Sequence, residues 1–197
     1  MMYDINLATE NVVYGTLDLS TSFKILNSIN AEVKSSPTFM TAEIGNGDEE
    51  EAVFDSIRKA TVCWLEKSEE GKALVDYLVK EINTGYFDLD ISNSAVEYQY
   101  TVYSNPNDHY DWHQDYYPED IDDVDFIRTL SISVCLTPDD VYDGAEFFIK
   151  DGNEANVRVF KMKFGDFIVF PSTCEHRVNA LREGERVSLV VWYGHSK

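Results

Sequence analysis

From residue 95 onward the chain consists of short strand-like runs separated by turns, and this pattern constrains its fold more than any other feature. Runs rich in Val, Ile, Phe and Tyr alternate with stretches that carry Pro, Asp or Gly, without helical periodicity between them. We predict eight strands, at residues 95–103, 110–114, 127–136, 145–149, 156–160, 166–170, 176–180 and 186–193. Such a series of short strands indicates a jelly roll or a barrel.

The first half of the chain mixes helix and strand. Residues 20–22, Ser-Thr-Ser, can cap a helix. Its buried face is predicted from helical spacing to comprise Phe23, Leu26, Ile29 and Val33. A second helix is predicted from Ser68, with acidic residues at its start and an end at residues 83–85. Its inner stripe is predicted to comprise Leu74, Tyr77, Leu78 and Ile82. The acidic segment 45–51 between the helices is predicted to be an exposed loop.

These helices are predicted to cover one outer face of the strands. Strand 187–193 is apolar on both sides, so both of its faces need cover. A chain of 197 residues is most simply one domain. We therefore predict an α+β protein with a single domain over residues 1–197, divided into a support region at 1–94 and a strand core at 95–197.

The charge of the chain bears on its partners. With 36 acidic and 16 basic residues the formal net charge is -20, which would repel a phosphate backbone, so we expect no nucleic-acid partner. The three cysteines form no CxxC pair and lie among apolar neighbours, which predicts reduced thiols. The N-terminus lacks a signal-peptide pattern, and no run of apolar residues is long enough to span a membrane. We expect a cytoplasmic protein without a membrane partner.

The stretch 109–117, HYDWHQDYY, contains the pattern His-x-Asp twice. Side chains two apart in a strand point the same way. Either pair, His109 with Asp111 or His113 with Asp115, could therefore offer an imidazole and a carboxylate to one metal ion. A second histidine from another strand would complete a set of two His and one carboxylate, which leaves open positions on iron(II). Alternation by itself does not choose between the pairs.

The distant histidine of such a set would be His176 or His195. His176 follows strand 166–170 and a Pro turn and begins the next strand. His195 lies close to the end of the sequence, where chains commonly fray. His176 is the better candidate.

Arg186 is the only charged residue in strand 186–193. A buried arginine needs an anionic partner, and its planar fork matches a carboxylate. Ser188, on the same face, could add a hydroxyl hydrogen bond to that carboxylate. Two interpretations stay open at this point, namely a bound carboxylate ligand and an internal salt bridge to one of the many acidic residues.

The strand at 129–136 alternates between two kinds of side chain. Leu130, Ile132, Val134 and Leu136 fall on one face, whereas Ser131, Ser133 and Cys135 fall on the other. The second face either leaves room for a ligand or faces solvent as one side of an ordinary sheet.

Five motifs carry a resemblance to a known family. They are YSNPNDHYDWHQD (103–115), RTLSISVCLT (128–137), DGAEFF (143–148), GDFIVFPSTCEHRV (165–178) and GERVSLVVWY (184–193). In order and spacing they resemble the iron(II)/2-oxoglutarate-dependent dioxygenases of prolyl 4-hydroxylase type. The resemblance covers residues from about 95 to 193, and SIRKATVCWL (56–65) resembles the family's supporting region more loosely. It implies a double-stranded β-helix core, of the jelly-roll or cupin-like kind, with supporting N-terminal helices.

The resemblance also implies roles for individual residues. It assigns iron(II) to His113, Asp115 and His176, and the distal carboxylate of 2-oxoglutarate to Arg186. Tyr103, ten residues before His113, matches a tyrosine whose hydroxyl reaches the cosubstrate, and Trp192 matches an aromatic wall of the pocket. The register with Tyr103 selects the second His-x-Asp pair, which leaves His109 and Asp111 as bystanders.

The sequence departs from the family pattern at two places. Ala145 stands where the family usually has glycine, so the turn there can differ. Ser133 and Cys135 stand where some relatives place a tyrosine, which leaves the remaining cosubstrate contacts open.

The implied reaction couples oxidative decarboxylation of 2-oxoglutarate to hydroxylation of a C–H bond, giving succinate and carbon dioxide, and ascorbate could serve as reductant. The expected substrate is a prolyl or other residue in a peptide or protein. The alternatives are the same reaction on a free amino acid or other small molecule, and a non-catalytic jelly-roll binding module. A zinc hydrolase with the same triad would leave a buried Arg186 unexplained.

Residues 116–126 are long for a hairpin loop and rich in acidic residues. Loops in such positions commonly close over substrate, and these carboxylates would attract a cationic substrate. The alternative is a solvated loop in an acidic protein.

Overall fold

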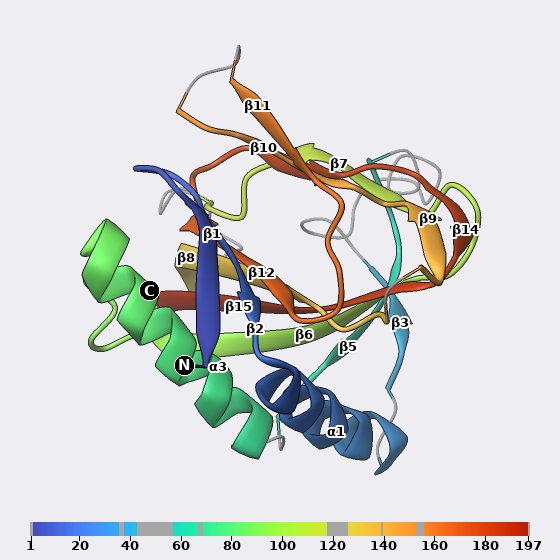
Figure 1. Ribbon diagram of the computed structural model, residues 1–197, viewed down its shortest axis with the longest axis horizontal. Helices are drawn as coiled ribbons and strands as arrows, with labels where there is room; N and C mark the ends of the chain where they lie inside the picture. The colour runs from blue at the N-terminus through green and yellow to red at the C-terminus, as the bar shows by residue number, and fades with distance from the viewer. Residues whose placement is uncertain are drawn as a thin grey trace.

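The computed structural model describes residues 2–35, 38–42, 57–66, 69–117, 126–138, 140–152 and 156–196. Two β-sheets face each other, and two helices pack on the outer face of the larger sheet (Figure 1). The expected jelly-roll core with supporting helices is confirmed. That one domain spans residues 1–197 stays a prediction.

The larger sheet has eight strands and runs through the middle of the molecule. Its order is β1 (Tyr3–Ala8), β2 (Val13–Leu17), β12 (Asp166–Pro171), β8 (Phe126–Cys135), β15 (Arg186–Ser196), β6 (Ala95–Tyr103), β5 (Thr61–Trp64) and β3 (Met40–Thr41). The long strand β15 pairs antiparallel with both β6 and β8. Because β15 lies between β6 and β8, inward-facing residues of these three strands are neighbours on the inner face of the larger sheet.

The smaller sheet has five strands and lies opposite the larger one. Its order is β11 (Val157–Phe160), β10 (Phe147–Lys150), β13 (His176–Val178), β7 (His109–His113) and β4 (Arg58–Lys59). A short pair, β14 (Leu181–Gly184) with β9 (Tyr142–Gly144), connects the layers at one side. The strand β4 comes from the first half of the chain and pairs with β7 at the edge of this sheet.

The strand prediction was right for every predicted strand and incomplete elsewhere. Between the predicted strands 176–180 and 186–193 lies a further strand, β14, which pairs with β9, and neither of the two was predicted. Strands β1 to β5 were not located within the mixed first half. Local periodicity carries little of their signal, because β3 and β4 have only two residues each and β2 and β5 also pair with strands far along the sequence.

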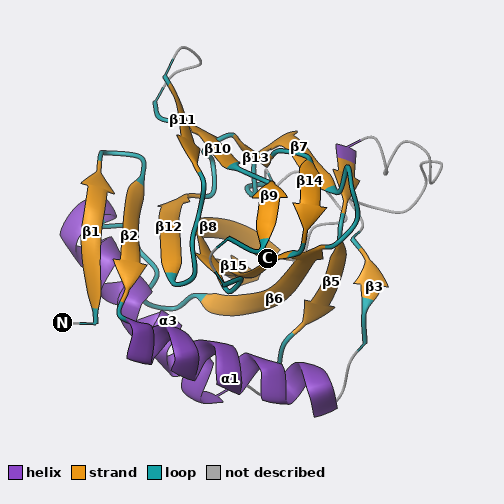
Figure 2. Cartoon of the chain, turned by 45° about the vertical axis from the view of Figure 1, so that its right-hand side comes forward, coloured by secondary structure: helices purple, strands orange, loops and turns teal. Residues whose placement is uncertain are grey.

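The helices α1 (Leu19–Ser35) and α3 (Glu69–Ile82) lie side by side under the larger sheet, as Figure 2 shows. Two residues of the predicted inner stripes are in fact exposed, namely Phe23 and Tyr77. Ile25 and Val75 are buried instead, because the contact faces are rotated relative to the predicted stripes. The end of the second helix also differs, since a π-helical turn (Asn83–Phe87) continues it to a left-handed Asp88. The acidic segment 45–51 lies outside the described residues.

The alternation in β8 separates two cores. Leu130, Ile132, Val134 and Leu136 join the apolar cluster beneath the helices. Cys135 joins the cluster between the sheets, and Ser131 and Ser133 are also buried. The small face of this strand therefore points into the jelly roll and not to solvent.

Two further features bear on earlier expectations. Cys63, Cys135 and Cys174 are free thiols, as predicted. Ala145, in the expected glycine position, has a φ of 49°, in the left-handed region that favours glycine. Within the described ranges, no helix combines the length and apolar character that a membrane crossing requires.

Candidate metal and carboxylate site

Two strands of the smaller sheet bring three potential metal ligands together. His113 ends β7 and lies opposite His176, the first residue of β13, in the antiparallel register. The Nε2 atoms of His113 and His176 each lie 3.6 Å from a different oxygen of Asp115. One ligand atom from each of these residues lies within 4.8 Å of the others. In the part of the chain that the structure describes, this is the one such group of histidine, cysteine and acidic residues.

Asp115 reaches this cluster by a route that strand alternation does not describe. Strand β7 ends at His113, and Asp115 lies in the bend that follows. The backbone N–H groups of Asp115 and Tyr116 both donate to the carbonyl of Ser172, at 3.0 Å. The bend is therefore fixed by the Pro turn that precedes His176, so one local structure positions both ligands.

The histidine tautomers suit metal binding. Nδ1 of His113 lies 2.7 Å from the carbonyl oxygen of Asp111, and Nδ1 of His176 lies 3.0 Å from that of Cys174. A carbonyl only accepts, so each Nδ1 carries a proton, and in the neutral ring the lone pair is then on Nε2, which faces Asp115. Backbone carbonyls thus orient both rings, as is common around metal-binding histidines.

The electrostatics of the cluster favour a neutral His113 ring and an ionised Asp115 carboxyl. Burial, with His176 nearby, lowers the pKa of His113 to about 3, so its ring is neutral at pH 7. Burial alone would raise the pKa of Asp115, but His176 and His113 hold it at about 2. Two neutral imidazoles and one carboxylate are the donor set that iron(II) takes in a facial triad. The residues present therefore fit the metal that the resemblance implies.

The other His-x-Asp pair lies outside this cluster. Nδ1 of His109 lies 2.8 Å from the carbonyl of Asn107 in the preceding turn. The carboxylate of Asp111 is exposed and accepts from the backbone N–H of Trp112 at 2.8 Å. The structure thus places His109 and Asp111 outside the cluster, and their assignment as bystanders stays a prediction.

A serine pair holds the Asp115 carboxylate from the larger sheet. The Ser131 hydroxyl lies 2.8 Å from Oδ2 of Asp115 and 2.8 Å from the hydroxyl of Ser172. Both serines are fully buried. Ser131 is therefore a positioning residue for Asp115, and the small face of β8 contributes this residue to the site.

Replacing Ser131 with alanine should lower iron(II) affinity by roughly 10- to 100-fold, because partners that orient metal ligands typically contribute that much. The measurement is a competition titration with a chelator that reports free iron(II). Ser22→Ala is the matched control, since the buried Ser22 hydroxyl donates to the carbonyl of Asp18, just before α1, and lies outside the site. Equal losses in both variants would mean general destabilisation and no positioning by Ser131.

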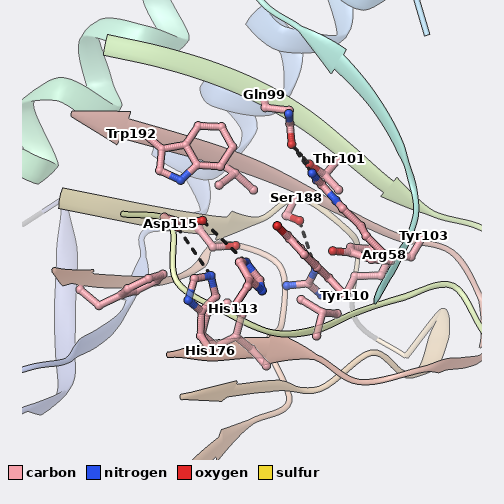
Figure 3. Close-up of a pocket in the computed structure, with 16 residues that line it drawn as sticks. Arg58, Gln99, Thr101, Tyr103, Tyr110, His113, Asp115, His176, Ser188 and Trp192 are labelled. Carbon is pink, nitrogen blue, oxygen red and sulfur yellow. Dashed lines mark hydrogen bonds and ion pairs between the residues drawn. The ribbon is translucent and has the colours of Figure 1, made fainter. Parts of the chain in front are cut away.

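A buried pocket opens beside the three ligands (Figure 3). All seven residues predicted for the site line it, namely Tyr103, His113, Asp115, His176, Arg186, Ser188 and Trp192. The structure therefore brings the predicted residues together from strands β6, β7, β13 and β15 and the bend after β7. Their individual roles stay predictions.

Arg186 begins β15 and is only 1% exposed. Its Nη1 donates to the Ser188 hydroxyl at 3.1 Å, and Nη2 lies 3.7 Å from the Met162 sulfur. Its Nε has no hydrogen-bond partner, and none of the ion pairs among the described residues includes Arg186. Of the two interpretations of this arginine, the internal salt bridge finds no partner within the described ranges. The site therefore offers a guanidinium to an external anion.

Tyr103 and Trp192 form opposite walls of the pocket. The guanidinium of Arg186 lies 5.6 Å from the centre of the Tyr103 ring, and burial raises the pKa of Tyr103, so its hydroxyl stays protonated. Trp192 is held by Arg128, which stacks on its indole at 3.8 Å and pairs with Glu97. The indole of Trp192 is thus held in place before any ligand enters.

Sequence reasoning missed four residues of the pocket that carry polar groups, namely Arg58, Gln99, Thr101 and Tyr110. Tyr110 stacks on His113 with ring centroids 3.4 Å apart. Gln99 and Thr101 share the inward face of β6 with Tyr103, so alternation from Tyr103 could have found them. Arg58 lies in the loosely matching segment 56–65, and only the pairing of β4 with β7 reveals its place.

Comparison with known proteins agrees with this geometry. The family model of the 2OG-Fe(II) oxygenase superfamily matches residues 98–194. A PKHD-type hydroxylase from Prochlorococcus marinus (strain AS9601) is 41% identical over 63 residues, which is 32% of this chain and 28% of the relative. A PKHD-type hydroxylase from Psychrobacter sp. (strain PRwf-1) is 36% identical over 72 residues, 36% of this chain and 27% of the relative. The aligned part thus spans less than a third of each relative's length.

Solved structures share the fold over nearly the whole chain. A prolyl-4-hydroxylase from Pseudomonas putida superposes with a TM-score of 0.69 at 20% identity, covering 96% of this chain and 95% of that one. A prolyl hydroxylase from Trichoplax adhaerens superposes with a TM-score of 0.70 at 18% identity, covering 94% of this chain and 84% of that one. It was solved in complex with a peptide fragment of the hypoxia inducible factor oxygen degradation domain. At these identities the likeness establishes the fold.

Proposed function

From the match of residues 98–194 to the family model of the 2OG-Fe(II) oxygenase superfamily, we propose that the chain is an iron(II)- and 2-oxoglutarate-dependent dioxygenase that hydroxylates its substrate. The observation that carries the proposal is the buried Arg186, without a carboxylate partner among the described residues, in the same pocket as His113, Asp115 and His176. A metal site alone would not need this arginine. A cosubstrate with a free carboxylate does.

Each group in the pocket has a defined task under this proposal. His113, Asp115 and His176 would hold the metal, which supplies, when bound, the redox chemistry that couples decarboxylation of 2-oxoglutarate to hydroxylation of a C–H bond. The reaction consumes 2-oxoglutarate, dioxygen and substrate, and it yields succinate, carbon dioxide and hydroxylated substrate. One oxygen atom enters each organic product, so the atoms balance.

The remaining residues orient the cosubstrate and keep water out. Arg186 would bind its distal carboxylate through the guanidinium fork, with the Ser188 hydroxyl, 3.1 Å from Nη1, beside the same group. The protonated hydroxyl of Tyr103 would donate to the cosubstrate, and Trp192 would close the apolar wall. None of these residues is required to accept a proton from the substrate carbon.

The substrate class proposed is a prolyl or other residue of a peptide or protein. The Trichoplax relative binds a peptide in its solved complex, and the fold is shared with it. The alternative is the same reaction on a free amino acid or other small molecule. The expectation of a cationic substrate rested on the acidic loop 116–126, of which residues 118–125 lie outside the described residues, so it stays a prediction.

Two further expectations belong to the same proposal. Ascorbate as a reductant rests on the family resemblance alone. A cytoplasmic location is supported by the three free thiols, which persist in a reducing compartment.

Adding iron(II) and 2-oxoglutarate without oxygen should give the weak visible charge-transfer absorption of a chelated cosubstrate. Readmission of oxygen should then release succinate, and a panel of peptides and free amino acids should identify the substrate by stimulated release. Iron binding without the absorption band would leave a metal-binding module and remove the dioxygenase proposal. Zinc-dependent hydrolysis in place of succinate release would do the same.

A further inference from the structure

The pocket contains a second buried guanidinium, that of Arg58. This residue is 8% exposed and lies on β4, outside the family-matched residues 98–194. Its Nη2 donates to Oε1 of Gln99 at 2.9 Å, and its Nε has no hydrogen-bond partner. None of the ion pairs among the described residues includes it. Such a buried cation is costly unless an anion joins it.

Aromatic stacking places Arg58 close to the metal ligands. Its guanidinium lies 4.5 Å from the centre of the Tyr110 ring, and Tyr110 in turn stacks on His113 at 3.4 Å. Figure 3 shows Arg58 passing beside Tyr110 toward Gln99. The amide oxygen of Gln99 also accepts from the Thr101 hydroxyl at 3.1 Å. Arg58 is thus held in one orientation by neutral groups only.

The charges of the pocket leave one positive charge unmatched. Among its lining residues the charged groups are the guanidiniums of Arg58 and Arg186 and the carboxylate of Asp115, with the two ligand histidines taken as neutral. A ferrous ion adds two positive charges, and 2-oxoglutarate removes two. The loaded site therefore keeps a net charge of one, located at Arg58 because Arg186 faces the cosubstrate. A substrate carboxylate would neutralise it.

We propose that Arg58, supported by Gln99 and Tyr110, binds a carboxylate of the substrate beside the metal and so selects substrates that carry one near the hydroxylated carbon. The proposal rests on the proposed function above. The residues assigned to iron and cosubstrate all lie in the family-matched segment, whereas Arg58 comes from the supporting half of the chain. This origin favours a role in recognising the particular substrate over the shared cosubstrate. The carboxylate can be that of a free amino acid, a peptide C-terminus or an acidic side chain.

The test is a binding titration of the protein loaded anaerobically with iron(II) and saturating 2-oxoglutarate. The probes are matched pairs that differ in one carboxylate, namely L-proline with L-prolinamide, and proline-containing peptides with glutamate or glutamine beside the proline. Calorimetry gives each dissociation constant, and the visible absorption band reports a change at the metal. We expect the carboxylate member of a pair to bind at least about tenfold more tightly than the amide member. The pair that shows the difference identifies the source of the carboxylate.

Two variants assign this preference to Arg58. Arg58→Gln should remove it, and Gln99→Glu should remove it as well, because the new carboxylate would pair with Arg58 internally. Gln99→Glu should also raise the melting temperature, whereas structural damage would lower it. Arg182→Gln is the matched control, since it removes the same charge from an exposed arginine that pairs with Asp143 and Glu146. It should keep the preference.

Several results would overturn the assignment. Equal binding of acids and amides, or no binding of any carboxylate probe by the unaltered protein, would remove the subsite. A weaker dissociation constant for 2-oxoglutarate in Arg58→Gln would mean that Arg58 serves the cosubstrate. Absence of the absorption band in the unaltered protein would refute the proposed function. The calorimetric comparison of Arg58→Gln with Arg182→Gln would still test anion binding in that case.

Discussion

Replacing His113 with alanine should lower iron(II) affinity by more than about 100-fold and abolish succinate release, whereas replacing His109 should change neither. Loss of a residue that merely orients a metal-ligating side chain lowers metal affinity roughly 10- to 100-fold. Loss of the metal-ligating side chain itself should lower the affinity further. His113 offers Nε2 to the cluster with Asp115 and His176, while His109 lies outside it. The two histidines belong to the same strand and to the same local motif. Replacement of His109 is therefore a well-matched control for replacement of His113.

Iron content after dialysis and the visible absorption with 2-oxoglutarate are the two measurements. Circular dichroism checks that both variants keep the fold, which matters because His113 also stacks on Tyr110. His113→Gln is a second variant that preserves more of this packing. Loss of iron from the His109 variant, with iron retained after replacement of His113, would reverse the assignment of the two His-x-Asp pairs.

Replacing Arg186 with methionine should weaken 2-oxoglutarate binding strongly while leaving the folded protein as stable or more stable. Breaking a buried charge pair costs about 2–5 kcal/mol, which corresponds to roughly a 30- to several-thousand-fold rise in the dissociation constant. Without ligand, however, the guanidinium is buried with no carboxylate partner among the described residues. Replacing such an ion by an apolar side chain is often neutral or stabilising. The opposite signs of the two effects distinguish a ligand-binding arginine from a structural one.

The dissociation constant comes from calorimetry under anaerobic conditions, and the melting temperature comes from thermal unfolding without ligand. Arg186→Lys keeps the charge but loses the planar fork, so its affinity should fall between those of the other two proteins. Arg182→Met is the exposed control and should leave 2-oxoglutarate binding unchanged. A melting temperature well below that of the unaltered protein, with 2-oxoglutarate affinity intact, would show that Arg186 stabilises the fold and binds no cosubstrate.

Arg58 and Arg186 together suggest how the chain divides its tasks. Arg186 comes from the long central strand of the family-matched segment, and Arg58 comes from an edge strand of the supporting half. Under the two proposals, Arg186 binds 2-oxoglutarate, the cosubstrate that such enzymes share. Arg58 binds a carboxylate of the particular substrate. The same pocket can thus keep its chemistry while its substrate changes.

The sequence by itself determined the strand core and the residues that line the site. The alternation of β8 predicted which side chains share a face, because the two faces of a strand alternate with a period of two, and the structure decided that the small face points inward. The motif spacing placed all seven predicted residues in one pocket. Local patterns were sufficient for six of these residues because each lies at the end or on the inner face of a strand.

Only the tertiary structure decided the remaining features. It showed that Asp115 lies in a bend held by Ser172 and not in the strand that carries His113. It also showed which helix residues are buried, since Phe23 of α1 is exposed and Ile25 is buried. Above all it brought Arg58 into the pocket through the pairing of a two-residue strand with β7. So short a strand carries almost no periodicity, and its position depends on a partner about fifty residues away in the sequence, which no local pattern encodes.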